Sequence, residues 1–165
     1  MVKLDKRKGI NIKEEKMGLD MYLKKEIYVG GNFEHREVKG TCYITVRGKE
    51  LNLPLNKIST ITLEMGYWRK ANQIHNWFVK NVQKGVDDCG KYYVSEENLL
   101  TLRETCKQVL INKKLASKLL PPQSGFFFGG TDYDEYYFKD LKETIKIIDE
   151  CLNNLNGEHY YRSSW

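Results

Sequence analysis

The chain has 165 residues, of which 30% are charged and 41% are hydrophobic, an ordinary balance for one globular domain. No apolar run approaches the ~20 residues of a membrane-spanning helix, and no hydrophobic signal core stands at the N-terminus, so we expect no membrane partner. The net charge is +5, but residues 1–16 hold six cations and three acids, which leaves a nearly neutral remainder. We therefore expect no general nucleic-acid binding by residues 17–165, because affinity for the phosphate backbone depends on positive charge.

Residues 1–16 are expected to form a disordered leader, because they combine many charges with no periodic apolar residues. The segment from Lys13 to Met17 can be encoded by a purine run that contains a ribosome-binding sequence directly before a start codon. Met17 is therefore a candidate natural initiator. The expected organisation is a leader over residues 1–16 and a single domain over residues 17–165.

The N-terminal half of that domain predicts four β-strands. β-forming residues dominate positions 19–29 before a Gly-Gly-Asn turn, and polar and apolar residues alternate over 37–46. Residues 51–55 contain a proline, which favours an edge strand, and residues 59–65 supply the fourth strand. Short connections between them indicate an antiparallel meander.

A helix is predicted over residues 67–83, because apolar residues recur there with the α-helical period. Trp77 lies at the edge of the polar face, beside Lys70 and Gln73, where an amphipathic helix does not require an aromatic side chain. Either another element covers Trp77 or it contacts a partner. The expected core face carries Tyr67, Ala71, Ile74, His75, Phe78 and Val82, and the expected polar face carries Arg69, Gln73, Asn76 and Lys80.

The C-terminal half predicts two further helices. Ser95 followed by two glutamates is typical of a capped helix start, and Thr131 and Asp132 are expected to cap the last helix. Residues 126–128, bounded by glycines, are expected to form a short buried strand, and residues 158–165 to return to the sheet. The predicted fold is α+β, with an antiparallel sheet from the N-terminal half packed against about three helices and a C-terminal strand.

Neither a metal nor a cofactor is expected. The four cysteines are widely spaced, with no C-x-x-C pair and no histidine at ligand spacing, so they are interpreted as free thiols in a cytoplasm. Asp132, Asp134 and Glu135 are too few for a calcium loop, which needs more oxygen ligands in a defined order. The same acids follow the glycine-rich stretch and would repel an anion at a phosphate-binding loop.

The candidate catalytic residues are His75, Asp20 and Arg69. No hydrolase nucleophile motif is present, and three histidines give no triad pattern. His75 on a core face is more simply a hydrogen-bonded structural histidine, and Asp20 a structural carboxylate at a turn. The candidate ligand- or partner-binding residues, chosen because aromatic, amide and cationic groups stand together, are Trp77, Arg69, Lys70, Gln73 and Arg162.

Three stretches give the chain a family resemblance: MGLDMYL from Met17, YWRKANQIHNWF from Tyr67, and YYRSSW ending at Trp165. Residues 17–165 resemble a family of small uncharacterised proteins of bacteriophages and prophages, with residues 1–16 outside the match. The resemblance implies an accessory gene expressed in the bacterial cytoplasm, whose product acts on host proteins or on nucleotide signals. It implies no established activity for any residue.

Two functions of different classes follow as hypotheses. The first is a non-enzymatic binding protein that occupies a host protein, for example a defence protein, or sequesters a nucleotide-like ligand. The alternative is a small enzyme that acts on a nucleotide or nucleic acid. A closed core around His75 would favour the first, and a cleft that joins His75, Asp20 and Arg69 would favour the second.

Overall fold

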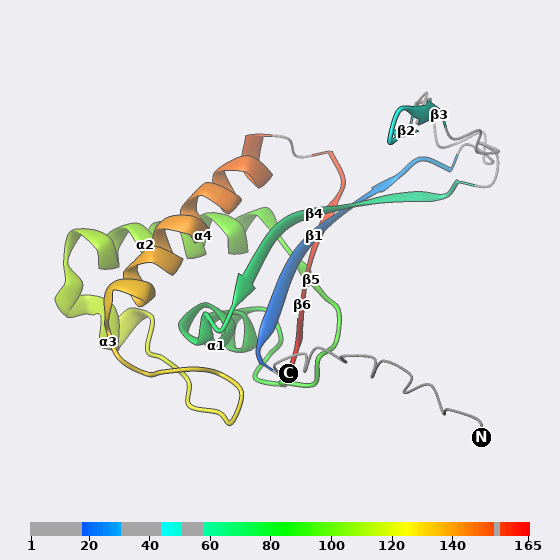
Figure 1. Cartoon of the computed structure of the whole chain (residues 1–165). Coiled ribbons are helices and arrows are strands. Elements are labelled where there is room, and N and C mark those ends of the chain that lie inside the picture. Colours follow the sequence, from blue (N-terminus) through cyan, green and yellow to red (C-terminus); the bar gives the residue numbers. More distant parts are fainter. Residues whose placement is uncertain (1–17, 31–43, 51–57, 154–155) are drawn as a thin grey trace, which may run out of the picture.

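The computed structural model describes residues 18–30, 44–50, 58–153 and 156–165 (Figure 1). The predicted leader over residues 1–16, the predicted strand over residues 51–55 and Cys42 lie outside these ranges. The described cysteines, Cys89, Cys106 and Cys151, are free thiols, as predicted. None of the helices in the described ranges is long and apolar enough to cross a membrane.

One antiparallel sheet of four strands organises the fold, in the spatial order β4-β1-β6-β5. Its strands are β1 (Asp20–Tyr28), β4 (Thr60–Arg69), β5 (Tyr92–Val94) and β6 (Glu158–Ser164). β6 is the predicted C-terminal strand, and it pairs with β1 at the centre of the sheet. Together with the helices this confirms the α+β class.

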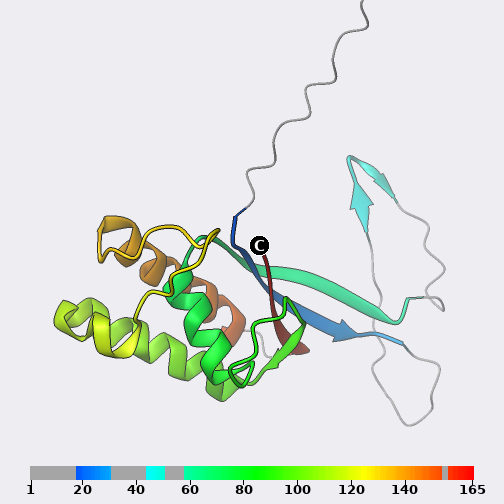
Figure 2. The same cartoon turned by 90° about the horizontal axis from the view of Figure 1, so that it is seen from below.

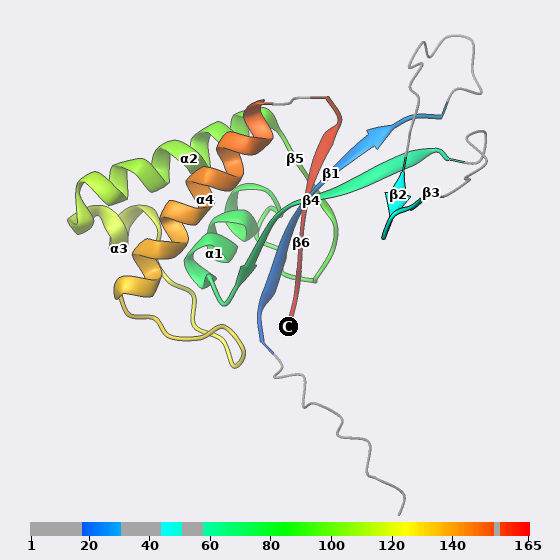
Figure 3. The same ribbon diagram turned by 45° about the horizontal axis from the view of Figure 1, so that its top comes forward.

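The predicted meander is only partly correct. β1 and β4 are direct neighbours, and the chain between them forms a separate two-stranded sheet of β2 (Thr45–Val46) and β3 (Lys49–Glu50). Arg47 and Gly48 join these strands, both at positive φ, as a tight hairpin turn requires. The hairpin lies beyond the far end of the β1–β4 ribbon (Figure 3).

The helices all lie on one face of the four-stranded sheet (Figures 1 and 2). Strand alternation explains this: Met21 and Leu23 of β1 are buried under the helices, whereas Tyr22 and Lys24 point to the other face. The helices are α1 (Asn72–Asn81), α2 (Glu96–Ile111), α3 (Ala116–Leu119) and α4 (Glu135–Asn153), with a 3₁₀ turn at Lys113–Leu115. Ser95 caps α2 in a capping box with Asn98, as the sequence predicts.

The predicted start of the central helix is wrong. β4 runs on to Arg69, and α1 begins only at Asn72. Lys70 makes the corner between them at φ 60, a left-handed conformation that is uncommon for lysine. Trp68 therefore belongs to the strand, and its indole Nε1 donates to Thr144 Oγ1 of α4 at 2.9 Å.

The segment before α4 also differs from the prediction. Residues 126–128 form a turn rather than a buried strand, and the Phe126 side chain is 95% exposed. α4 begins at Glu135, and Asp134 Oδ1 accepts from the Tyr137 backbone N–H, so Asp134 replaces the predicted cap at Thr131 and Asp132. This segment becomes one wall of a pocket.

Candidate functional site

α1 is buried on all sides, which the amphipathic prediction did not anticipate. Every residue from Asn72 to Val79 is buried, and Gln73 and Asn76 of the expected polar face are only 3% and 8% exposed. Buried amides need hydrogen-bond partners, and α4 supplies those of Gln73 while the segment before α4 supplies that of Asn76. Asn76 Nδ2 donates to the Pro121 carbonyl at 2.9 Å.

Asn72 fixes the same segment at the N-terminus of α1. Its Nδ2 donates to the carbonyls of Phe128, at 3.0 Å, and Gly130, at 2.7 Å. Its Oδ1 accepts from the Gln123 backbone N–H at 3.2 Å. One amide thus holds three points of the loop over residues 121–134 against the start of α1.

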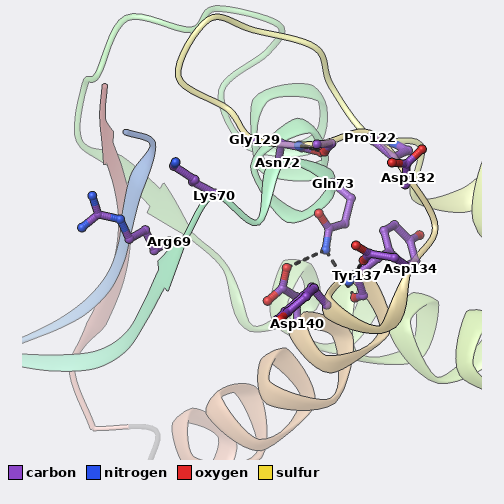
Figure 4. Close-up of a pocket in the computed structure, with 12 residues that line it drawn as sticks. Arg69, Lys70, Asn72, Gln73, Pro122, Gly129, Asp132, Asp134, Tyr137 and Asp140 are labelled. Atoms are coloured by element: carbon purple, nitrogen blue, oxygen red, sulfur yellow. Dashed lines mark hydrogen bonds between the residues drawn. The ribbon is translucent and has the colours of Figure 1, made fainter. Parts of the chain in front are cut away.

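A pocket of about 300 Å³ lies between this loop, the corner after β4, and the starts of α1 and α4 (Figure 4). That volume is at the lower end of the range for small-molecule sites. Three of the five predicted binding residues line it, namely Arg69, Lys70 and Gln73. The structure therefore brings together residues that the sequence indicated, although it does so through a strand–helix corner rather than one helix face.

The two sides of the pocket carry opposite charge. Arg69 and Lys70 stand on one side, with side chains that extend outward from the rim, and Asp134 and Asp140 line the other (Figure 4). Burial raises the pKa of Asp140 above its ordinary value, and the hydrogen bond from Gln73 acts in the opposite direction. The pocket thus has two cationic residues on one side and three carboxylates on the other, of which Asp132 and Asp134 are exposed and Asp140 is partly buried.

Gln73 connects these two sides. Its Nε2 donates to Asp140 Oδ2 at 3.1 Å and reaches the Tyr137 carbonyl at 3.5 Å, which fixes the orientation of the amide. The amide oxygen is on the side turned away from Asp140 (Figure 4). Asp140 and Gln73 therefore both present oxygen acceptors to the pocket.

Trp77 and Arg162 lie outside the pocket. Trp77 is 7% exposed and belongs to the buried hydrophobic core, so the structure matches the alternative in which another element covers it. A direct role in contacting a partner would require the ring to leave the core. Arg162 is exposed on β6, opposite Tyr22 of β1.

The three candidate catalytic residues do not converge. His75 is fully buried, with Nδ1 2.7 Å from the Tyr161 hydroxyl and Nε2 2.9 Å from Asp87 Oδ2. Asp20 instead pairs with Arg69 at 3.7 Å, on the sheet face away from the helices. Both nitrogens of His75 are occupied in a closed core, which is the arrangement expected of a structural histidine.

The sheet face that none of the described helices covers, here called the open face, is a second candidate surface, and it was not predicted from the sequence. Tyr67 and Tyr93 are 43% and 57% exposed there, and Tyr22 lies 5.4 Å from Tyr67 between ring centroids. The alternation of β1 was the available signal, because its polar positions include two tyrosines. Two ion pairs lie on this face, Lys91 with Glu26 at 2.6 Å and Arg69 with Asp20 at 3.7 Å.

Comparison with family models, with curated proteins and with solved structures finds no match to this chain. The resemblance to phage proteins therefore stays a prediction, and function has to be argued from the residues themselves. Among the described residues, no group of three or more His, Cys, Asp or Glu side chains is placed to hold a metal ion. Asp132, Asp134 and Glu135 thus lie close in sequence without forming such a group.

Proposed function

We propose that the protein is a phage-encoded binding protein of the bacterial cytoplasm that sequesters a small nucleotide-like ligand in the pocket beside α1. The observation that carries this proposal is the polarity of the pocket, with Arg69 and Lys70 at its mouth and the acceptors of Gln73 and Asp140 inside. A nucleotide has the complementary polarity, since it joins an anionic phosphate to a base that carries N–H donors.

The size of the pocket and its one aromatic rim residue support the same class of ligand. A volume of about 300 Å³ suits a mononucleotide better than a dinucleotide. Tyr136 lines the pocket and its ring is 74% exposed, so it is free to stack on a base. Cations at the mouth would meet the phosphate, which stays near solvent.

Sequestration fits better than catalysis. The alternative of a small enzyme rests on His75, Asp20 and Arg69, and these lie in two different places. Asp140 is the pocket carboxylate with a raised pKa, but it is held by Gln73, and the described lining contains no serine, threonine, cysteine or histidine. Most of the described lining side chains can form hydrogen bonds, which suits binding of a polar ligand.

The first test is a thermal-shift panel of nucleoside mono-, di- and triphosphates, followed by calorimetry on those that raise the melting temperature. Lys70→Ala should weaken binding of the best ligand about tenfold or more, because it removes a cation at the mouth. Lys80→Ala, an exposed lysine in the last turn of α1, is the matched control and should leave affinity unchanged. Failure of every nucleotide to bind would refute the proposal.

A second candidate function, occupation of a host protein, is favoured by the open face. Exposed tyrosines among internally paired charges are typical of protein interfaces, in which aromatic residues are enriched. Affinity purification from infected cells tests it: the Tyr67→Ala and Tyr93→Ala double variant should lose a partner that the Lys70→Ala variant retains. A partner retained by both would place the interface elsewhere.

A further inference from the structure

The hydrogen-bonding groups inside the pocket indicate which edge of a ligand they would contact. This inference rests on the proposed function. Only 3% of the Gln73 surface is exposed, yet its side chain lines the pocket. Because Nε2 donates to Asp140 and to the Tyr137 carbonyl, the amide oxygen is left on the opposite side. Within the described chain the structure gives that oxygen no hydrogen-bond donor, and it is not among the buried unsatisfied atoms, so an accessible acceptor stands at the pocket wall.

Asp140 adds a carboxylate with spare acceptor capacity to this wall. Its Oδ2 accepts one hydrogen bond, from Gln73, whereas an ionised carboxylate offers about four acceptor positions. Burial raises the pKa of Asp140, so donation from a ligand N–H would stabilise the ionised form that the folded protein disfavours. By contrast, Asp134 already accepts from the first turn of α4.

The Asp140 carboxylate is therefore complementary to a ligand edge with two adjacent N–H donors. Among mononucleotides, guanine has that edge, because its N1–H and its 2-amino group lie side by side and match the two oxygens of one carboxylate. Adenine has an acceptor at N1, and hypoxanthine lacks the 2-amino group. A guanidinium such as that of arginine offers similar donors, and its carboxylate could reach the cations at the mouth.

We infer that the pocket selects a guanine mononucleotide, with N1–H and the 2-amino group donating to Asp140 and the phosphate beside Lys70 and Arg69. Tyr136, which lines the pocket and is 74% exposed, would stack on the purine ring. In this orientation the base separates the phosphate from Asp140, so the distance weakens the repulsion between the two charges. An anionic ligand can therefore bind beside acidic residues, because the carboxylate contacts the base and the cations contact the phosphate.

The decisive experiment compares GMP, IMP, AMP and free arginine by calorimetry on the full chain. GMP should bind about 10- to 100-fold more tightly than IMP and AMP, since each lost hydrogen bond to a charged group costs about 1.5–3 kcal/mol. Equal affinities for the three nucleotides would overturn this inference while leaving the proposed function intact. Preference for arginine over GMP would overturn both, as would binding of no nucleotide.

A specificity switch supplies a second, independent test. Asp140→Asn exchanges one acceptor for an N–H donor in a side chain of the same shape. The affinity for GMP should therefore fall about tenfold, and the affinity for XMP, whose 2-carbonyl is an acceptor, should rise. Glu143→Gln, the same chemical change at an exposed position of α4, should keep the wild-type preference. An Asp140→Asn variant that folds and still prefers GMP would contradict the inference, and if it does not fold, the nucleotide comparison on wild type decides.

Discussion

Asn76 lies on the helix face that sequence periodicity assigns to solvent, yet it is 8% exposed and bonded to the Pro121 carbonyl. Asn76→Ala should therefore reduce the free energy of unfolding by about 1–3 kcal/mol, because it leaves a buried carbonyl without its donor. Chemical denaturation measures this, with Lys80→Ala as an exposed control that should stay within about 0.5 kcal/mol. Equal, small effects at both positions would mean that the loop does not depend on this bond.

Trp77 is a core residue in the structure, in edge-on contact with Phe78. Trp77→Ala should cost about 3–5 kcal/mol of folding free energy, as truncation of a buried aromatic does. If the variant instead keeps its melting temperature and loses a binding partner, Trp77 is a contact residue and its packing against Phe78 contributes little.

His159 gives the protein a specific pH dependence. It is 5% exposed, its Nε2 has no hydrogen-bond partner in the described chain, and burial, together with the charge of Lys25, lowers its pKa. Below the ordinary histidine pKa of about 6.5, the unfolded chain binds a proton at this histidine, whereas the folded protein binds it only at lower pH. The free energy of unfolding therefore falls as the pH drops from about 6.5 towards the lowered pKa of His159. His159→Gln should flatten this fall in denaturation curves between about pH 7 and pH 5. An unchanged slope would assign the acid sensitivity to other groups.

At the scale of elements, the sequence predicts what depends on local patterns. The Ser95 cap, the first strand with its β-forming residues and the return of β6 were all predicted from the sequence, and all appear in the structure. The β4–α1 boundary is not visible, because no glycine or proline marks it and Lys70 adopts a left-handed conformation instead. Residues on both sides of that corner fit one helical period by coincidence.

The candidate site was predictable in part for a related reason. Arg69, Lys70 and Gln73 were predicted as binding residues because they are polar groups close to a tryptophan in the sequence, and they do line one pocket. Asp134 and Asp140 were not identified as its opposite wall, because they come from a segment more than sixty residues away in the chain. Periodicity assigns polar residues to solvent, and it cannot show that a loop returns to bury them.

The close approach of α4 to β4 makes a further prediction at this scale. A Cβ added at Gly66 would lie 2.5 Å from Cγ2 of Ile147, so Gly66→Ala should cost about 1–3 kcal/mol through overpacking. Ile147→Ala should remove that clash, so the double variant should be more stable than the sum of the two single losses implies. Purely additive losses in thermal denaturation would mean that the helix does not press on the strand here.

At the scale of the whole molecule, the helices cover one face of the sheet, and no other described element covers the second face (Figure 2). The pocket and the open face are therefore distinct surfaces, joined at one point by Arg69, which lines the pocket and pairs with Asp20. A ligand at the mouth of the pocket competes for that arginine. Variants on the two surfaces should for this reason separate ligand binding from partner binding, except at Arg69.

The central claim is that the pocket beside α1, rather than the open sheet face, holds the small ligand. Hydrogen–deuterium exchange with and without saturating GMP tests it most directly, because it reports which backbone amides the ligand protects. We expect slower exchange in residues 70–74 and 122–140, with β1 and β6 unchanged. Protection along β1 and β6 with none in residues 122–140 would contradict the account.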